Sequence, residues 1–380
     1  VADTTLDFVV QIGFPACSLY GSLQERTGLT IRSSRCHFTA AIFFGMFVLV
    51  CGRAVAQLNS GVRAHMERSM QRKLPFFVLM LFPVVGTCQD HRSLDTVIRL
   101  AHERAYRSEF VQWEEVTSKA DSIAISKGED AAIRFVLAAL GDRHSSYRPP
   151  QPPAAPTATE TAGSARTRLS QQREAVEGVP VIEVAGWSGS LPEGTAAAAT
   201  LRSQVIDSLA SSGCGVVLDF SSNHGGNMWP MLAGLEPLLT EGVLGYFQDA
   251  HGTNKTIEKR GGTFLVNGSA QPFVGTELRP KNAAAHIAVV VGPKSASSGE
   301  IVPIMLHGQS NVVLFGRPTS GHSTSNSTFR LPNGGFVNIT TATTLDRNKV
   351  VFGGAVIPDH LSDQPIVDAA RWIASECHRK

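Results

Sequence analysis

The feature that most constrains this chain is a short apolar run followed directly by a turn of small residues. The run, Ala285 to Val291, leads into Lys294-Ser295-Ala296-Ser297-Ser298-Gly299-Glu300. This pattern predicts a buried strand, a tight turn and a helix. Such a turn can expose one side chain, while the first N–H groups of the helix have no partner inside it. Ser297 is therefore a candidate nucleophile, although serine-rich turns that merely cap helices have the same composition.

A second segment has the same order of strand, turn and helix, built around a pair of glycines. Val216 to Phe220 runs into a polar stretch that contains Gly225 and Gly226, and an apolar-periodic segment from Met231 to Leu239 follows. Paired glycines can adopt positive φ and leave backbone N–H groups facing a negative charge. They are candidate oxyanion donors. The alternative is an ordinary glycine turn between a strand and a helix.

A third segment, Ala139 to Tyr147, closes a predicted helix and contains His144 just beyond the helix end. A neutral imidazole can accept the proton of a serine hydroxyl near pH 7, so His144 is a candidate general base. A surface or capping histidine is the alternative from this segment alone.

Taken together, the three segments resemble the C-terminal processing (tail-specific) serine protease family. The family's Leu-x-Asp-x-His-Ser/Thr-x-Tyr, Leu-Asp-x-x-x-Asn-x-Gly-Gly and Ser-Ala-Ser-x-x-Glu elements occur in that order, and two later turns match at Gly316 to Gly321 and Gly353 to Asp359. The resemblance covers about Asp90 to the C-terminus. It implies a serine-type peptidase that acts on peptides or unfolded proteins through an acyl-enzyme on Ser297.

The choice of base depends on the branch of the family. One branch uses a Ser–Lys dyad, but the matching turn here reads Ser320-Gly321-His322-Ser323 and has no lysine. The other branch, similar to the tricorn protease core, uses the histidine of the upstream element, which is His144 here. We therefore expect Ser297 and His144 to act together. His322 is the rival base because it occupies the place of the lysine, and a base elsewhere stays open.

The resemblance also suggests the remaining members of the site. Relatives of the tricorn type orient the histidine with an acid near the later glycine turn, where this chain has Phe352. Glu300, three residues after Ser297 on a predicted helix, is the substitute that we expect. Family members take oxyanion donors from two places, which correspond here to Gly225 and Gly226 and to the N–H of Ser298. Two other functions remain open: a catalytically weak relative that binds peptides as an added strand, and an esterase acting on small acyl substrates.

The composition agrees with an enzyme rather than a nucleic-acid-binding protein. The chain has 380 residues, 43% of them hydrophobic, and a net charge of +2. No nucleotide-binding or zinc-binding spacing is present, so we expect no cofactor, no metal and no nucleic-acid partner. Cys214 and Cys377 are the two cysteines in the catalytic part. We expect no dependence on disulfides, with one bridge left open.

We predict four regions. Residues 1–88 form a targeting region, 89–148 a helical module, 149–178 a linker rich in Pro, Ala and Thr, and 179–380 the catalytic domain. Alternating strands and helices predict an α/β fold, and the resemblance implies a ClpP/crotonase-like β-α spiral. The linker is too short for the PDZ domain that dyad-branch relatives carry at this point.

The first region contains two apolar runs typical of export signals. Phe38 to Val50 is followed by small residues, and Pro75 to Val85 follows a basic segment that begins near Met66 or Met70. Both runs are too short to predict a membrane span. We therefore expect an exported protein, periplasmic or extracellular, whose signal is the second run. A short N-terminal membrane anchor is the alternative.

Overall fold

The computed structural model describes residues 6–11, 18–24, 28–33, 92–151, 168–274 and 285–378. The chain divides into two compact units, Val1–Asp90 and His91–Lys380. In the first unit, β1 (Leu6–Gln11), β2 (Ser18–Gln24) and β3 (Gly28–Ser33) form an antiparallel sheet. The two predicted export signals lie outside the described residues. No helix in the described ranges combines the length and the apolar character that crossing a membrane requires.

The second unit contains a mostly parallel sheet of six strands in the order β17-β13-β12-β7-β6-β5. Its strands run parallel to their neighbours except for β5, which pairs antiparallel with β6. Their bounds are β5 (Ser170–Val176), β6 (Val179–Val184), β7 (Gly215–Asp219), β12 (His286–Val291), β13 (Val312–Gly316) and β17 (His360–Leu361).

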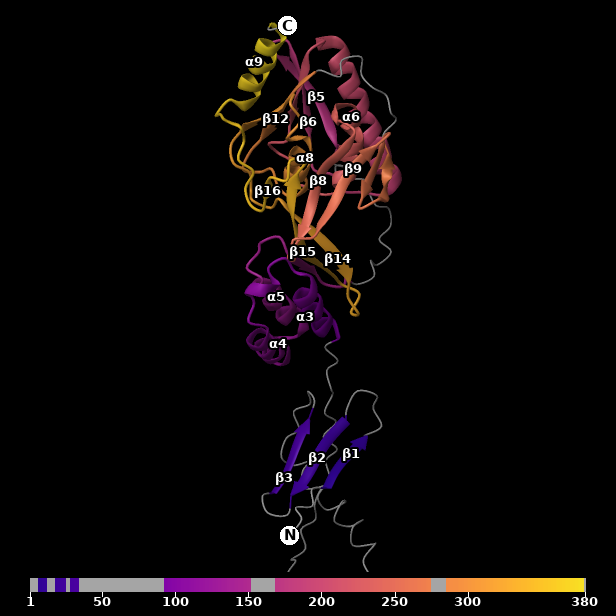
Figure 1. Cartoon of the computed structure of the whole chain (residues 1–380), viewed down its shortest axis with the longest axis vertical. Helices are drawn as coiled ribbons and strands as arrows, with labels where there is room; N and C mark the ends of the chain where they lie inside the picture. Colours follow the sequence, from indigo (N-terminus) through magenta and orange to yellow (C-terminus); the bar gives the residue numbers. More distant parts are fainter. Residues whose placement is uncertain are drawn as a thin grey trace, which may run out of the picture. The chain divides into compact units, whose positions relative to one another are not determined.

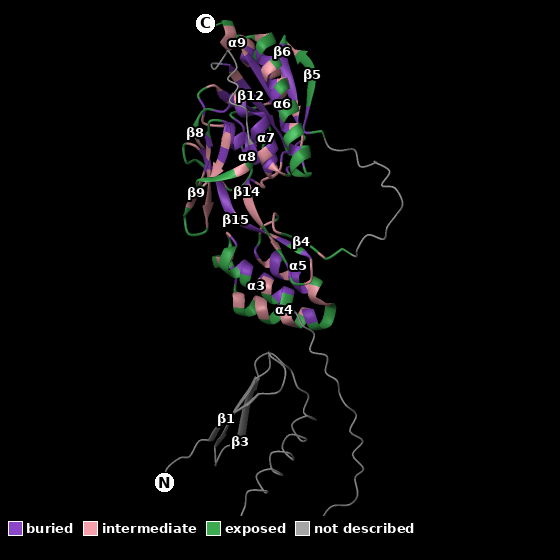
Figure 2. Ribbon diagram, turned by 90° about the vertical axis from the view of Figure 1, so that its right-hand side faces the viewer, coloured by how far each residue is buried: buried purple, intermediate pink, exposed green. Residues whose placement is uncertain are grey.

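Helices cover both faces of this sheet (Figure 1). Successive side chains of a strand point to opposite faces. In β12, Ile287 and Val289 accordingly pack with α6 (Leu191–Ser212), α7 (Met228–Gly234) and α8 (Ser298–Leu306), whereas Ala288 and Val290 pack with α9 (Pro365–His378). Burial on both faces explains why the central strands are nearly continuous apolar runs. Figure 2 shows these strands as buried.

A second sheet is antiparallel and has the order β11-β10-β9-β8-β15-β14, with β4 and β16 also paired to β15. Its longest strand, β15, therefore contacts four others along its length. The bounds are β4 (Ser146–Arg148), β8 (Gly242–Asp249), β9 (Asn254–Arg260), β10 (Thr263–Val266), β11 (Ser269–Val274), β14 (Thr324–Arg330), β15 (Phe336–Asp346) and β16 (Val351–Phe352).

The helical module packs against one end of this antiparallel sheet (Figure 2). It consists of α3 (Arg92–Arg104), the short η1 (Ser108–Phe110), α4 (Trp113–Lys127) and α5 (Glu129–Ala139). A second short helix, η2 (Glu236–Leu238), lies outside the module and follows α7. The apolar stripes of the module share one buried cluster with Tyr147, Val337 and Ile339. The module is thus attached through β15, the strand that pairs with β14.

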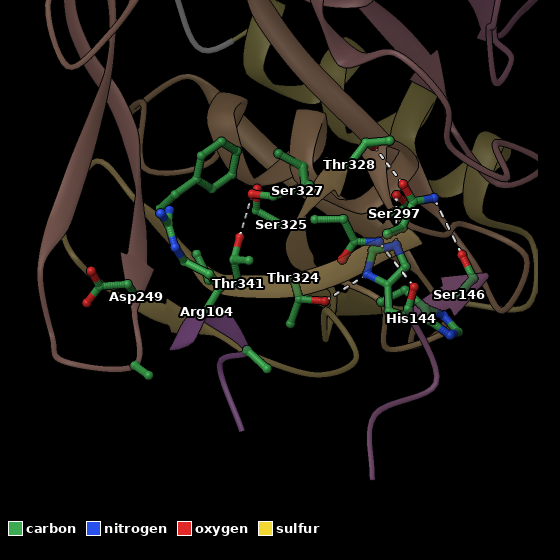
Figure 3. Close-up of a pocket in the computed structure, with 18 of the residues that line it drawn as sticks. Arg104, His144, Ser146, Asp249, Ser297, Thr324, Ser325, Ser327, Thr328 and Thr341 are labelled. Carbon is green, nitrogen blue, oxygen red and sulfur yellow. Dashed lines mark hydrogen bonds between the residues drawn. The ribbon is translucent and has the colours of Figure 1, made fainter. Parts of the chain in front are cut away.

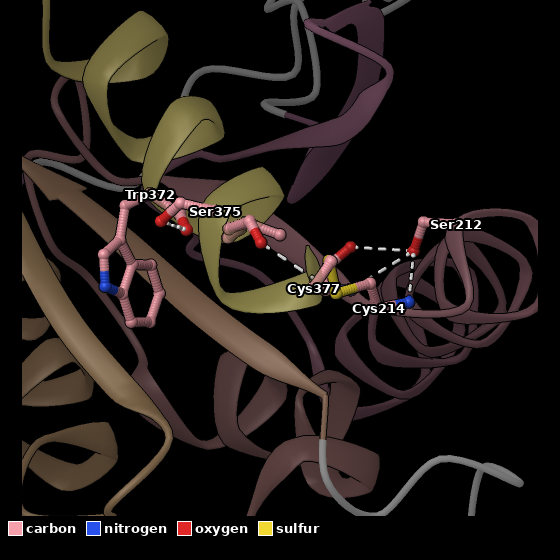
Figure 4. The surroundings of a disulfide bond; sticks show 7 residues. Ser212, Cys214, Trp372, Ser375 and Cys377 are labelled. Carbon is pink, nitrogen blue, oxygen red and sulfur yellow. Dashed lines mark hydrogen bonds between the residues drawn. A yellow bond between two sulfur atoms is a disulfide. The ribbon is translucent and has the colours of Figure 1, made fainter. Parts of the chain in front are cut away.

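A disulfide joins Cys214 to Cys377, with their Cα atoms 5.9 Å apart and a sequence separation of 163 (Figure 4). It ties the end of α9 to the residue before β7. The one bridge that the sequence analysis left open is therefore present. The residues lie far apart in sequence, so only the packing of α9 on β7 brings them together.

The predicted elements agree with the structure at most places. The alternation of strands and helices confirms the α/β class, and the strands expected at Val216–Phe220 and Ala285–Val291 are β7 and β12. One boundary differs. The predicted linker, 149–178, includes β5, an edge strand whose side chains are mostly exposed and polar. Its polar composition resembles a linker because, among the described strands, β6 alone pairs with it.

Candidate active site

Ser297 lies at the junction between the Gly292–Ala296 turn and α8, which follows β12. Its backbone has φ 54° and ψ −120°, a region that non-glycine residues rarely adopt. Such a conformation costs about 1–3 kcal/mol and persists where its surroundings enforce it. Here every residue of α8 is buried. The strained turn directs the hydroxyl into a cleft rather than into the core, as in other strand–turn–helix nucleophile sites.

His144 meets this hydroxyl from the other side of the cleft (Figure 3). Its Nε2 lies 3.2 Å from Ser297 Oγ, and its Nδ1 lies 2.8 Å from Thr324 Oγ1 at the start of β14. The turn that presents the ring is held by Asp142, whose Oδ1 accepts the N–H of His144 at 2.9 Å. With the proton on Nδ1 donated to Thr324, Nε2 is free to accept the serine proton.

The surroundings keep His144 neutral. Its pKa is lowered from 6.5 to about 4, mainly by burial and next by the nearby His322, while Asp142 acts in the opposite direction. The charged imidazolium is disfavoured because the ring is partly removed from water. At neutral pH the ring is therefore available as a proton acceptor. The same low pKa makes it a weaker base than a histidine in water.

His322 is close to the base but turned toward other groups. Its ring stands edge-on to that of His144, with centroids 5.3 Å apart, and its Nδ1 lies 2.9 Å from Ser320 Oγ. Among the described residues, His144 is the histidine whose ring contacts the Ser297 hydroxyl. The geometry thus favours His144 over His322 as the base.

Glu300 occupies a different position from the one expected of an orienting acid. Its fully buried carboxylate accepts the N–H groups of Ser297 at 3.1 Å, Gly321 at 3.0 Å and His322 at 2.7 Å, and it also bonds the Thr319 hydroxyl. These bonds account for both carboxylate oxygens. Glu300 therefore clamps the loop beside the nucleophile, and the group that contacts Nδ1 of the base is a threonine hydroxyl.

The paired glycines lie directly against the nucleophile turn. A side chain at Gly225 would place its Cβ 2.8 Å from that of Ser297, and the Ser298 hydroxyl donates to Gly226 O at 2.5 Å. The N–H of Gly225 already donates to Asn223 Oδ1 at 2.8 Å. Among the described residues, no acceptor bonds the N–H groups of Gly226 and Ser298. Of the three expected oxyanion donors, these two remain available.

Sequence reasoning missed Thr324. It belongs to a polar strand, Thr-Ser-Asn-Ser-Thr, in which nothing separates one hydroxyl from the next. Its contact with His144 joins residues 180 apart in the sequence. The pairing of β14 with β15 creates that contact, and no local pattern signals it.

The site opens into a cleft of about 1260 Å³. The helical module supplies His102, Arg104 and Trp113 to its lining, and the β8–β9 hairpin supplies Asp249 and Lys255. Ser297 and His144 both line it, as do most residues of β14. A cleft of this size is large enough for several residues of a polypeptide rather than a single small molecule.

Comparisons with known proteins agree with this geometry. Residues 181–361 match the family model of peptidase family S41. The nisin-resistance protein of Lactococcus lactis subsp. lactis is 31% identical over 163 residues, which cover 43% of this chain and 50% of that relative. The chain thus matches about half the length of this curated relative. The matched family segment includes Ser297 and the glycine pair, whereas His144 precedes it.

Two solved structures share the fold. A lipoprotein from Streptococcus agalactiae has a TM-score of 0.63 and 23% identity, covering 75% of this chain and 96% of the other. The photosystem II D1 C-terminal processing protease has a TM-score of 0.51 and 16% identity, covering 76% and 98%. This likeness supports the ClpP-like α/β core that the sequence resemblance implied. Over residues 181–361 the chain thus resembles peptidase family S41, a family of serine-type peptidases.

Proposed function

We propose that this protein hydrolyses peptide bonds through an acyl-enzyme formed on Ser297, with His144 as the general base. The observation that carries the proposal is the 3.2 Å approach of His144 Nε2 to Ser297 Oγ, beside two backbone N–H groups without a partner among the described residues. A nucleophile, a base and an oxyanion site within one cleft are the minimum that acyl transfer requires.

In the acylation step, Ser297 Oγ attacks the scissile carbonyl carbon while His144 Nε2 accepts the hydroxyl proton. The imidazolium continues to donate its Nδ1–H to Thr324 Oγ1, and this hydrogen bond fixes the plane of the ring. The carbonyl oxygen becomes an oxyanion that accepts the N–H groups of Gly226 and Ser298. His144 then donates its proton to the leaving amine as the C–N bond breaks, which leaves an ester on Ser297.

Deacylation repeats these steps with water as the nucleophile. His144 accepts a proton from the water, the hydroxyl attacks the ester carbonyl, and Ser297 recovers its proton as the acid product leaves. The loss of one oxyanion donor typically lowers such rates by about 100- to 1000-fold. Glu300 contributes by holding the Ser297 amide and the His322 loop rather than by contacting the reacting atoms.

The substrate and the location belong to the same proposal. We expect cleavage of extended peptides or unfolded proteins, with a preference for tails near a C-terminus, because a D1 C-terminal processing protease shares the fold and a nisin-resistance protein shares part of the sequence. We expect export, with or without an N-terminal anchor. The Cys214–Cys377 bridge supports this location, since disulfides persist in oxidising compartments.

A fluorophosphonate probe tests the proposal directly, because it labels an activated serine without any knowledge of the substrate. The purified full chain should be labelled, and both Ser297→Ala and His144→Ala should abolish labelling. Ser295→Ala is the matched control for the serine, because that buried hydroxyl bonds Phe220 O and lies away from the base. Absence of labelling in the folded wild-type protein would contradict the enzyme.

One observation favours a second candidate, a peptide-binding relative with little activity. The pKa of His144 is lowered to about 4, and its Nδ1 contacts a neutral hydroxyl instead of a carboxylate. Both features weaken the base. This protein would bind extended peptides in the cleft and fail to label with the probe.

A further inference from the structure

The strand β14 forms one margin of the cleft along its free edge. In the antiparallel sheet it is the terminal strand and pairs with β15 on one side; the described residues place no strand on the other. Thr324, Ser325, Asn326, Ser327 and Thr328 all line the cleft. Neighbouring side chains of a strand point to opposite faces of the sheet. Because side chains from both faces of β14 line the cleft, the cleft runs along the edge of this strand.

The pairing with β15 shows which main-chain groups face this edge. Asn326 stands opposite Thr340. The Thr340 N–H donates to Ser145 Oγ at 3.0 Å, and its carbonyl accepts the N–H of Tyr106 at 2.8 Å, so both groups point away from β14. The Asn326–Thr340 pair is therefore a non-hydrogen-bonded pair of the ladder. The N–H and C=O of Asn326 consequently face the free edge, and alternation places those of Thr328 on the same side.

These four main-chain groups have no hydrogen-bond partner within the described ranges. The strand also lacks the usual protection of a sheet edge, because it contains no proline and no charged residue before Arg330. An edge of this kind is a template for one more strand. Here the template lies inside a cleft rather than on open surface, which limits the occupant to an extended chain.

The side chains along the edge are small and polar. Ser325 and Ser327 lie on one face of the strand (Figure 3), and the Ser327 hydroxyl is already 3.0 Å from Thr341 Oγ1. On the other face, Thr328 bonds Asn338 and the Asn326 side chain donates to His144 O. Because the side chains of Asn326, Ser327 and Thr328 are engaged within the protein, the main chain is the larger part of what the strand offers to a ligand.

We propose that β14 is the substrate-binding strand, and that an extended polypeptide adds to its free edge by exchanging main-chain hydrogen bonds with Asn326 and Thr328. This inference rests on the proposed function and names its substrate class: unfolded or extended segments, recognised by their backbone more than by their sequence. Thr324, at the start of the strand, contacts the base, so the added segment leads directly to the scissile bond at Ser297.

The length of the free edge of β14 sets a minimum length for the substrate. From Thr324 to Thr328 the strand spans roughly 13 Å at about 3.3 Å per residue. A substrate therefore needs about four residues on that side of the scissile bond to reach both pairs of main-chain groups. Peptides truncated below this length should lose affinity in steps, as each pair of bonds is lost.

An N-methyl scan tests the inference on the full chain carrying Ser297→Ala. A fluorescent, unstructured peptide that binds this variant is methylated at one backbone nitrogen at a time, and its Kd is measured by fluorescence anisotropy. Each lost hydrogen bond should weaken binding by about tenfold. We expect losses at every second position, because alternate N–H groups of an added strand face β14. Equal tolerance or equal loss at all positions would overturn the inference.

A protein variant tests the same bonds from the other side. Thr328→Pro removes one outward N–H and the side-chain bond to Asn338, but no main-chain bond to β15, and proline is compatible with an edge strand. In the Ser297→Ala background it should weaken peptide binding by about tenfold. Glu174→Pro, on the exposed edge strand of the other sheet, is the matched control and should leave the Kd unchanged.

The outcomes distinguish the proposed role of β14 from the proposed catalytic function. Cleavage and probe labelling by the wild-type protein, together with no alternation in the scan and no effect of Thr328→Pro, would overturn the role of β14 alone. A protein that is not labelled but binds peptides with period-two sensitivity would overturn the catalytic proposal and retain the strand. If Thr328→Pro fails to fold, the N-methyl scan still tests the inference, because it uses a protein with an unaltered β14.

Discussion

The two halves of the proposed catalytic pair are supported very differently by the surrounding structure. Ser297 stands at the start of a helix whose residues are all buried, after a central strand with helices on both faces. His144 follows α5 in a helical module whose second helix, α4, buries just Ala120 and Ala124 along its length. The nucleophile and its oxyanion donors are therefore built into the main core, whereas the base belongs to a smaller cluster packed on one end of a sheet.

This difference predicts which part of the site fails first. The strained backbone of Ser297 is enforced by extensive packing, so its position should persist in any protein that remains folded. The position of His144 depends on the module, on the Asp142 turn and on a few contacts with β14, where Thr324 bonds the ring and the Asn326 side chain bonds the carbonyl. Activity should therefore be lost through displacement of the base before it is lost through the nucleophile.

Removal of the base should have the largest effect. His144→Ala should lower kcat/KM by about a thousand-fold or more, since both proton transfers lose their acceptor. His322→Ala is the matched control, because its ring contacts His144 and Ser320 rather than the nucleophile. It should retain most of the activity at neutral pH. Equal losses in the two variants would contradict the assignment of the base.

A cavity made in the helical module should lower both stability and catalysis, whereas a cavity under α9 should lower stability alone. Ile133 in α5 and Ile373 in α9 are both almost fully buried, and replacing either by Ala should cost about 2–5 kcal/mol in the free energy of unfolding. Although both variants are destabilised, Ile133→Ala alone should also lower kcat at temperatures where the protein is folded. Thermal denaturation and kinetics at several temperatures provide the measurement. Unchanged kcat in Ile133→Ala would show that the module holds the base rigidly.

The disulfide allows a test on the nucleophile side. Replacing Cys377 by Ser removes the bridge that ties α9 to β7, and the loss of a disulfide closing so long a loop should cost about 2–4 kcal/mol. Because α9 packs on the sheet face opposite to α8, kcat of the folded variant should stay near that of the wild type. A large fall in kcat without loss of stability would mean that α9 helps to position the nucleophile turn.

The same comparison explains what the sequence could predict. Ser297, Gly225 and the strands leading to them follow from local patterns: an apolar run, a turn of small residues and a helix start. His144 was predicted as part of a short motif. These features are local because each depends on a few neighbouring residues.

The features that were missed depend on distant contacts. The contact of Thr324 with the base follows from the register of β14 on β15, which shifts between Ser325 and Asn326. Glu300 was correctly expected near Ser297 because both lie in one helical turn, but its direction is set by amides of a loop some twenty residues further along the chain. Sheet register and loop placement are products of tertiary packing, which short sequence patterns do not encode.

Thr324 itself offers a smaller test. Thr324→Val keeps the shape of the side chain and removes the hydroxyl that contacts Nδ1, so kcat should fall by about tenfold, the equivalent of one hydrogen bond. Thr324→Ser keeps the hydroxyl and should restore most of the rate. A positioning role predicts that KM changes less than kcat. If Ser fails to restore the rate, the methyl contacts rather than the hydrogen bond hold the ring.

The pH dependence gives the finest distinction between the two histidines. The base must be unprotonated, so activity should be present above the pKa of His144 and should fall only as the pH drops through about 4, rather than near 6.5. His322→Gln removes the second cause of the lowered pKa while burial remains. The acid limb of kcat/KM should then move to higher pH and stay below 6.5. A limb that does not move would mean that burial alone keeps the base neutral, and that His322 acts on the site through its loop.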